Sequence, residues 1–262
     1  GVLERRGHTE AAVDLSRLAG LEEIGVICEI MRDDGMMARA EDLIRFKREH
    51  GLRMTSVAEL VLYRHQSEQF VERIQEVNMP TEWGDFRCLM YHSPTEGRHH
   101  IAMILGEPHL QKEPPVRIHS ECLTGDILGS LRCDCGSQLR NAMQSIANEG
   151  HGALIYMRQE GRGIGLPMKI HAYGLQDEGL DTVEANERLG FAADARDYGI
   201  AAQILKDLRL ERIRLLTNNP RKIEGLLRYG IEIEGRIDVP SRLTPHNARY
   251  LDTKRKKMGH IL

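Results

Sequence analysis

Three of the five cysteines in this chain of 262 residues lie close together, in the pattern C-x10-C-x-C. They are Cys122, Cys133 and Cys135. Closely spaced thiols outside a secreted disulfide framework favour a zinc site, and three protein ligands leave the fourth tetrahedral position for water, as in catalytic sites. Cys133 and Cys135 are too near for a relaxed disulfide, and a turn at 124–126 would bring Cys122 to both. The alternative is three buried thiols that pack as small hydrophobic side chains.

A glycine-rich turn follows an apolar strand predicted at 153–157. It reads R-Q-E-G-R-G-I-G over 158–165 and precedes a helix predicted through Lys169 and Tyr173. Backbone N–H groups and the dipole at a helix N-terminus favour an anion there, and Arg158 and Arg162 could pair with phosphate oxygens. The turn matches neither a Walker A loop nor G-x-G-x-x-G, so a tight structural turn is the alternative.

A second strand end carries polar residues. Residues 213–217 predict a buried strand, after which Asn219 can cap a helix with Pro220 at its first position. Thr217 and Lys222 would then lie at the carboxyl end of the strand, where open α/β sheets bind ligands. A solvated helix lysine is the alternative for Lys222. Gln138, in the first turn of a helix predicted at 136–150, is either a site residue or an exposed one.

Composition excludes several classes of protein. The formal net charge is −3 with both signs well mixed, which differs from the basic domain of a general nucleic-acid binder. No apolar run approaches the roughly 20 residues of a membrane span, and no signal peptide is visible. We therefore expect a cytoplasmic protein without a nucleic-acid or membrane partner. Because the chain opens with Gly1 directly before a dense motif, we expect it to be a fragment.

The predicted elements indicate an α/β fold, with a mixed sheet flanked by helices and carrying the zinc site. Before it we expect a small incomplete α+β segment at 1–64, with a helix capped by Thr9, a strand at 25–31 and helices from 41 and 55. Residues 65–79 are predicted as a linker with a short helical lead-in, and residues 80–262 as the second domain. The run K-R-K-K at 254–257 predicts a solvated helix face.

The first segment carries the motifs R-x-G-H-T-E-A-x-V-D-L and C-E-I-x-x-D-D-G-x-M-A-R. These resemble the C-terminal part of 3,4-dihydroxy-2-butanone-4-phosphate synthase. The resemblance implies sugar-phosphate contacts and one magnesium ligand at the remnant positions Arg5, Gly7, His8 (the ligand), Thr9 and the acid Glu29. The family's acidic metal-binding motif is absent, and one histidine cannot hold a magnesium ion that prefers several oxygen ligands. We therefore expect this segment to be inactive; a helix-capping cluster with a strand-edge glutamate is the alternative.

From about Phe70 onward the chain resembles GTP cyclohydrolase II. The motifs are R-I-H-S-E-C-L-T-G-D, R-C-D-C-G-x-Q-L, R-Q-E-G-R-G-I-G-L, D-T-V-E-A-N, G-F-A-A-D-x-R-D-Y and L-L-T-N-N-P-x-K. The order of the two segments resembles bifunctional riboflavin-pathway proteins.

This second resemblance implies hydrolysis of GTP to a diaminopyrimidinone, formate and diphosphate, with Zn²⁺ on the three cysteines, Mg²⁺ on the triphosphate, and a homodimer. It also implies a set of GTP-binding residues: Arg117, Ile118, His119, Ser120, Glu121, Gln138, Glu160, Gly161, Arg162, Thr182, Thr217 and Lys222. The catalytic residues it implies are Asp194 as proton acceptor, Arg196 as nucleophile and Tyr173.

The role of Arg196 has two interpretations. A guanidinium stays protonated and has no lone pair to offer, so it could attack phosphorus only if Asp194 took its proton in a dry site. Alternatively, Arg196 stabilises charge on the α-phosphate while water attacks.

Two rival functions remain open on the sequence. A zinc-stabilised binding module would need a fourth fixed ligand, for which His119 is the nearest candidate. A zinc nucleotide deaminase would carry the H-x-E and P-C-x-x-C signature, which this sequence lacks.

Overall fold

The computed structural model describes residues 1–192 and 196–261, which divide into two compact units at Glu68 and Gln69. The first unit contains α1 (His8–Leu18), α2 (Ala40–Glu49) and α3 (Val57–Ser67). Val2, Leu60 and Val61 form its small core, and the buried Arg64 pairs with Asp14 at 2.9 Å. Polar pairing therefore supplements a core too small to be strongly stabilising on its own.

Two predictions for the first unit are wrong. The strand expected at 25–31 is absent: within the described residues this stretch makes only an isolated bridge between Met31 and Met37, and Val26 is 99% exposed. An apolar run needs a partner strand to become β-structure. The first helix begins at His8 with Gly7 as its N-cap, so Thr9 lies inside the helix and is not its cap.

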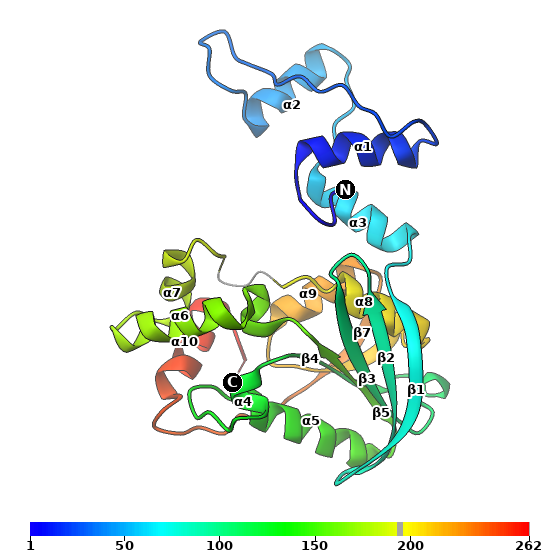
Figure 1. Cartoon of the computed structure of the whole chain (residues 1–262), viewed down its shortest axis with the longest axis vertical. Coiled ribbons are helices and arrows are strands. Elements are labelled where there is room, and N and C mark those ends of the chain that lie inside the picture. Colours follow the sequence, from blue (N-terminus) through cyan, green and yellow to red (C-terminus); the bar gives the residue numbers. More distant parts are fainter. Residues whose placement is uncertain (193–195, 262) are drawn as a thin grey trace. The chain divides into compact units, whose positions relative to one another are not determined.

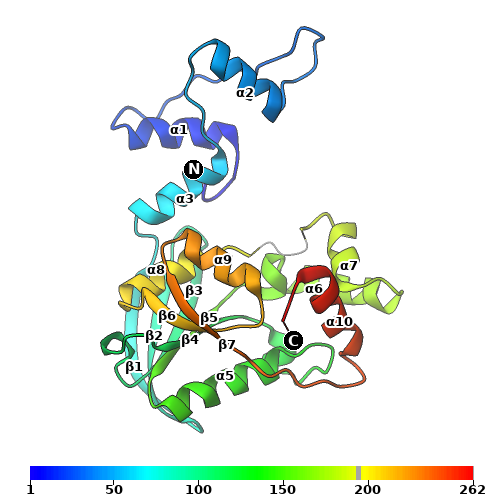
Figure 2. The same ribbon diagram turned by 180° about the vertical axis from the view of Figure 1, so that it is seen from behind.

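The second unit is built on one seven-stranded sheet (Figures 1 and 2). Its strands are β1 (Glu72–Thr81), β2 (Gly84–Ser93), β3 (Arg98–Leu105), β4 (Pro115–Ser120), β5 (Gly152–Met157), β6 (Arg212–Leu216) and β7 (Glu232–Ile237). The spatial order is β1-β2-β3-β5-β4-β6-β7. The pairs β1/β2, β2/β3 and β3/β5 are antiparallel, and β5/β4, β4/β6 and β6/β7 are parallel. The sheet is mixed, as predicted.

Strand β1 occupies most of the stretch that we expected to be a linker. Its register with β2 runs from Glu72 opposite His92 to Thr81 opposite Gly84. Ile74 and Val77, expected in a helical lead-in, therefore lie in a strand. The short turn between Thr81 and Gly84 explains the difference, because it brings the two strands together as a hairpin whose backbone groups pair along its length.

Helices cover both faces of the parallel half of the sheet. The second unit contains α4 (Leu123–Asp126), α5 (Cys135–Glu149), α6 (Gly165–Asp177), α7 (Thr182–Arg188), α8 (Gly199–Asp207), α9 (Pro220–Arg228) and α10 (Ala248–Met258). Leu154 of β5 packs with Met143 of α5 in one core. Its neighbour Ile155 packs with Ile204 of α8 in the other. Since successive strand residues point to opposite faces, α5 and α8 lie on opposite sides of the sheet (Figures 1 and 2).

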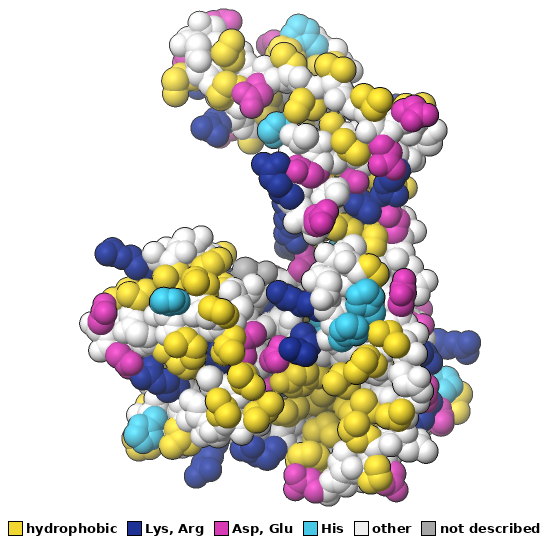
Figure 3. All heavy atoms as spheres, viewed as in Figure 1, with side chains coloured by type: hydrophobic (Ala, Val, Ile, Leu, Met, Phe, Trp, Pro, Cys, Tyr) yellow, Lys and Arg dark blue, Asp and Glu magenta, His cyan; other side chains and the backbone are white. Residues whose placement is uncertain are grey.

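The antiparallel half of the sheet leaves apolar side chains at the surface. Figure 3 shows hydrophobic side chains gathered over this part of the second unit. Val77, Met79 and Met90 are 45%, 40% and 39% exposed. The helix α5 contacts β4 and β5, so the covered, site-bearing half is the parallel one. Among the described residues, no helix is both long and apolar enough to cross a membrane.

Candidate active site

Three parallel strands deliver the candidate site at their carboxyl ends. Cys122 follows β4, the 3₁₀ turn Glu160–Gly163 follows β5, and Thr217 follows β6. The chain passes from β4 through α5 to β5 on one side, and returns across β4 through α8 to β6 on the other. Such a reversal of direction opens a crevice at the strand ends, which is where open α/β sheets bind ligands.

The three predicted cysteine ligands meet in that crevice. Their sulfur atoms all lie within 4.8 Å of one another, and the sulfurs of Cys122 and Cys133 are 3.7 Å apart. Zn–S bonds of about 2.3 Å in a tetrahedron set two sulfurs about 3.8 Å apart. The separation of the Cys122 and Cys133 sulfurs therefore matches that of two thiolates on one zinc ion, and the third sulfur lies close enough to join them.

Two glycines allow the cysteine-bearing segments to approach so closely. A Cβ on Gly125 of α4 would lie 2.7 Å from Cys133 Sγ and 3.1 Å from Cys122 Sγ. A Cβ on Gly136 of α5 would lie 2.2 Å from the carbonyl oxygen of Gly125. The turn predicted at 124–126 is thus a short helix, and it is packed against the first turn of α5.

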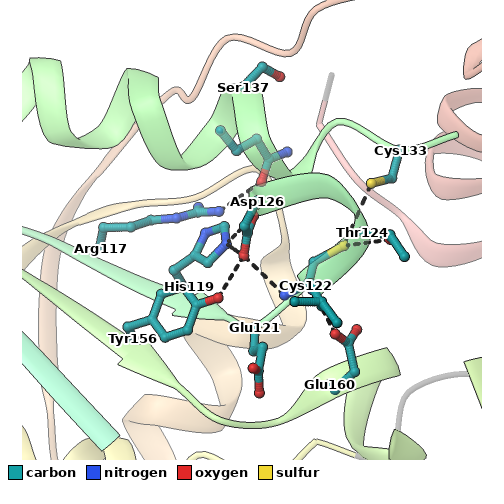
Figure 4. A network of polar contacts seen from close by, with 12 residues as sticks. Arg117, His119, Glu121, Cys122, Thr124, Asp126, Cys133, Ser137, Tyr156 and Glu160 are labelled. Atoms are coloured by element: carbon teal, nitrogen blue, oxygen red, sulfur yellow. Dashed lines mark hydrogen bonds and ion pairs between the residues drawn. The ribbon is translucent and has the colours of Figure 1, made fainter. Parts of the chain in front are cut away.

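Asp126 fixes the backbone of the first cysteine (Figure 4). Its Oδ2 accepts hydrogen bonds from the Cys122 amide at 3.0 Å and the Tyr156 hydroxyl at 2.9 Å. His119 Nε2 lies 3.0 Å from the same oxygen, and burial lowers the pKa of His119 in spite of that carboxylate. Nε2 of His119 is therefore bonded to Asp126, and the candidate metal cluster among the described residues contains cysteines but no histidine.

Lys169 and Glu160 form a buried charged pair beside the sulfurs. Lys169 Nζ lies 2.8 Å from Glu160 Oε1 and 3.0 Å from Cys122 Sγ. Burial alone would lower the pKa of Lys169, but the Cys122 thiolate and Glu160 outweigh it and raise that pKa. The thiols of Cys133 and Cys135, together with the Lys169 ammonium, lower the pKa of Cys122. The surroundings therefore favour a thiolate, the form that binds metal.

Glu160 also joins the glycine-rich turn to the first cysteine. Its Oε2 accepts the Leu123 amide at 2.7 Å, and its Oε1 accepts the Gly161 amide at 2.9 Å. Arg162 within this turn has φ 62°, a left-handed conformation that is uncommon for a non-glycine residue. Strain of this kind clusters at functional sites.

A polar chain crosses the crevice on the other side of the sulfurs. Arg117 donates to the Leu216 carbonyl at 2.8 Å and to Gln138 Oε1 at 2.7 Å. Gln138 donates to Asp134 at 2.6 Å, and Lys254 donates to the second oxygen of Asp134 at 2.7 Å. Burial lowers the pKa of Arg117 to about 10. Gln138 is therefore buried and lines the pocket, so it is not an exposed helix residue.

Most of these groups line one open pocket. The predicted residues that line it are Arg117, His119, Ser120, Glu121, Cys122, Cys133, Cys135, Gln138, Glu160, Gly161, Arg162, Tyr173, Thr182, Arg196, Thr217 and Lys222. Ile118 is fully buried in the core and does not line it, although its carbonyl accepts from Lys222 Nζ at 2.7 Å. Asp194 lies outside the described residues. Lys222 is 4% exposed, so it is not a solvated helix lysine.

The remnant synthase residues belong to the other unit. Arg5 pairs with Glu10 at 2.8 Å, Gly7 caps α1, and His8, Thr9 and Glu29 are exposed.

The pocket also contains side chains that the sequence analysis did not identify as site residues. Among them are Lys169, Tyr250, Lys254 and His260, and Lys254 is in turn bonded to the buried Asp134. The prediction of a solvated face for the run at 254–257 is wrong for Lys254, which is 6% exposed. Its partner Asp134 is 120 residues away in the sequence, so no local pattern signals the pair.

Comparison with known proteins follows the same division of the chain. The family model of GTP cyclohydrolase II matches residues 72–238, well over half of the chain. The chain belongs to the GTP cyclohydrolase II family. The family model of 3,4-dihydroxy-2-butanone 4-phosphate synthase matches residues 1–63. The motifs quoted above are therefore confirmed as those of these two families.

Similar proteins carry the same pair of segments. The riboflavin biosynthesis protein RibBA of Bacillus cytotoxicus is 55% identical over 262 residues, which is all of this chain and 66% of that protein. RibBA of Salinispora arenicola is 54% identical and is covered over 63% of its length. The chain thus spans just under two thirds of these relatives.

A solved structure is also similar. It is RibBX, described as a two-domain 3,4-dihydroxy-2-butanone 4-phosphate synthase from A. baumannii, at 33% identity with a TM-score of 0.61. The alignment covers 92% of this chain and 61% of that one.

Proposed function

We propose that this chain hydrolyses GTP to 2,5-diamino-6-(5-phosphoribosylamino)pyrimidin-4(3H)-one, formate and diphosphate, the first step of riboflavin biosynthesis. The observation that carries the proposal is the three-cysteine cluster in a crevice lined by cationic side chains, within a chain of the GTP cyclohydrolase II family. Ring opening needs an activated water at C8 of guanine, and loss of diphosphate needs positive charge on the phosphates. The pocket offers both kinds of group in one space.

Cys122, Cys133 and Cys135 would hold the zinc ion. The chemistry that zinc supplies when bound is acidification of water toward a pKa of about 7, which provides a nucleophile near neutral pH. The described residues around the sulfurs contribute no fourth ligand, so a water can occupy the remaining position. This favours the catalytic interpretation over the closed binding module.

Several buried polar atoms at the pocket have no hydrogen-bond partner among the described residues. They include Arg117 Nε, His119 Nδ1, Ser120 Oγ and Asn219 Nδ2. Buried polar groups in folded proteins are nearly always satisfied. These four atoms have almost no accessible surface, so a guanine nucleotide would satisfy them only through a bound water or a small shift of the pocket wall.

The phosphates would lie among the cations. Arg162, Arg196 and Lys222 line the pocket, and so do Glu160 and Gly161 of the turn after β5. We propose that Mg²⁺ enters with the triphosphate, because magnesium in such sites is bound largely by substrate phosphates. Tyr173 donates to, or accepts from, Thr124 at 3.2 Å, which holds its hydroxyl close to the cysteine turn.

The role of Arg196 can be decided by trapping. If Arg196 attacks the α-phosphorus with Asp194 as proton acceptor, a guanylyl adduct on Arg196 will be recovered after rapid acid quench. If it only stabilises charge, Arg196→Lys will hydrolyse GTP without any adduct.

The decisive experiment incubates the purified chain with GTP, Zn²⁺ and Mg²⁺ and measures formate and the pyrimidine product. Cys133→Ser is expected to abolish both, and the matched control Cys28→Ser, at an exposed thiol of the other unit, is expected to leave both unchanged. Undiminished formate from Cys133→Ser would remove the metal assignment. Ammonia in place of formate would favour the deaminase.

We further propose that residues 1–64 form no butanone-phosphate from ribulose 5-phosphate, because Arg5 is paired with Glu10 and Glu29 is exposed. Turnover by the chain would contradict this. We also propose the homodimer that the resemblance implies and the cytoplasmic location expected from the sequence, and light scattering of the purified chain tests the assembly.

A further inference from the structure

We propose that the C-terminal segment, residues 248–261, is part of the catalytic apparatus. In this proposal Lys254 and Tyr250 are positioning residues that hold the cysteine turn and the glycine-rich turn against one another. The inference rests on the proposed function for the identity of the substrate. The family match ends at residue 238, so this segment lies outside the part of the chain that the match assigns.

Lys254 holds the residue between two metal ligands. Its ammonium lies 2.7 Å from Asp134 Oδ1, and Asp134 is the residue between Cys133 and Cys135. The Asp134 side chain is fully buried, and its other oxygen accepts from Ser241 at 2.7 Å and from Gln138 at 2.6 Å. Without Lys254 this carboxylate would be a buried charge without its counter-ion, which a folded chain tolerates poorly. The turn would have to move to expose it, and both sulfurs would move with it.

Tyr250, one turn earlier on α10, lies between two cations. The Lys254 ammonium is 4.8 Å from its ring centroid, and the Arg162 guanidinium is 5.9 Å from the same centroid. Both distances are within the range of cation–π attraction. Arg162 is the residue held at φ 62° in the glycine-rich turn. The contact with Tyr250 therefore helps to keep a strained residue of the pocket wall in place.

The C-terminal end of the segment is bonded to the loop that follows β6. The Ile261 amide donates to the Asn218 carbonyl at 3.0 Å, and Asn218 directly follows Thr217. On its outer side α10 contacts α7 through Lys257, which lies 3.0 Å from Glu184. Tyr250, Lys254 and His260 all line the pocket. One segment thus contacts the cysteine turn, the glycine-rich turn and the loop after β6.

These contacts predict a separable effect on the metal and on the nucleotide. Lys254 acts through Asp134, so its loss is expected to change zinc affinity first. Tyr250 acts through Arg162, so its loss is expected to change nucleotide affinity while zinc affinity stays. A segment that merely stabilised the fold would lower both together with the thermal stability.

The metal test uses the full chain loaded with zinc. Lys254→Met is expected to weaken zinc binding about 10-fold or more in chelator competition, as for other residues that orient metal ligands, and Lys254→Arg is expected to restore most of it. The matched control is Lys256→Met, on the same helix, where the lysine pairs with Asp252 and is 67% exposed. Zinc binding by Lys254→Met equal to that of the control would overturn the proposal.

The nucleotide test is a double-mutant cycle measured with a non-hydrolysable GTP analogue by calorimetry. Tyr250→Leu is expected to weaken binding about 5-fold in the parent chain and to have no further effect when Arg162→Gly is already present. Equal effects in both backgrounds would refute the coupling, even if Lys254→Met fails to fold.

Measuring formate release from GTP alongside zinc affinity distinguishes a failure of this proposal from a failure of the proposed function. If the parent chain releases no formate from GTP but the zinc effect of Lys254→Met and its rescue are found, the function is wrong and the positioning role stands. If formate is released and the variants behave like Lys256→Met, the function stands and this inference is wrong.

Discussion

Replacing Gly125 by alanine tests the cysteine cluster through geometry alone. Gly125 is buried in α4, and its φ is not in the left-handed region, so alanine brings no backbone strain. The added Cβ would lie 2.7 Å from Cys133 Sγ and 3.2 Å from Cys135 Cβ. The variant changes neither a ligand nor a charge, and any loss of metal must come from displaced sulfur.

The displacement can be estimated from these distances. Non-bonded heavy atoms need about 3.5 Å or more, so the sulfur of Cys133 must retreat by roughly 0.8 Å. Metal–ligand distances tolerate about ±0.2 Å. The cluster cannot accommodate the methyl group and keep three Zn–S bonds, and we expect zinc affinity to fall at least about 10- to 100-fold, or roughly 1.4 to 2.7 kcal/mol.

Chelator competition followed at the metal, together with metal content after gel filtration, measures this loss. The control is Gly174→Ala in α6, where the added Cβ has no atom within 4 Å; alanine there should leave zinc affinity unchanged and raise stability slightly. If Gly125→Ala binds zinc as tightly as the parent chain, the reasoning is refuted, because the sulfurs would then have more space around Gly125 than the structure shows.

Three further changes test other parts of the argument. Asp126→Asn should lower the free energy of unfolding by about 1 to 3 kcal/mol in urea titration, because one buried donor loses its carboxylate acceptor; unchanged stability would show that the bonds to Asp126 are not maintained. The hydrogen bond from Arg64 holds the pKa of Glu68 below its usual 4.5, so Glu68 stabilises the fold above that pH and loses the effect as pH falls through the lowered value. The drop in Tm caused by Glu68→Gln should therefore be largest at neutral pH and should shrink as the pH falls through the lowered pKa, and a drop that does not change with pH would contradict the pairing. Arg162→Gly should relieve left-handed strain and raise stability by about 1 kcal/mol while weakening nucleotide binding; Arg209→Gly, at φ 57°, should raise stability alone, and equal nucleotide affinity in the two variants would exclude a site role for Arg162.

The residues that the sequence analysis identified share one property: their role can be recognised from residue types within a few positions of the sequence. Cys133 and Cys135 are separated by a single residue, and Asn219 caps α9 by accepting from the Arg221 amide at 3.1 Å, as the order Asn-Pro predicted. Such signals depend on side-chain type and on contacts within one turn, so they can be interpreted before the fold is known.

The errors arise where the outcome depends on a distant partner. The run 25–31 is richer in strand-forming residues than 72–81, but only the second has a neighbouring strand that pairs with it along its length. Apolar pattern alone cannot distinguish them, because a strand is stabilised by cross-strand pairs.

Lys254 presents the same problem on a helix. Its neighbours Lys256 and Lys257 are 67% and 44% exposed, whereas Lys254 is turned toward Asp134 and buried. A run of four cations on α10 is expected to be solvated as a whole, yet helical geometry separates its members by about 100° per residue, so one of them can face inward while the others face water. Whether a lysine of the run is buried depends on whether a buried carboxylate lies on the inner side of the helix. Here that carboxylate belongs to Asp134, which lies between Cys133 and Cys135. The burial of Lys254 therefore follows from the construction of the metal site, and the charge run becomes interpretable only after that site is known.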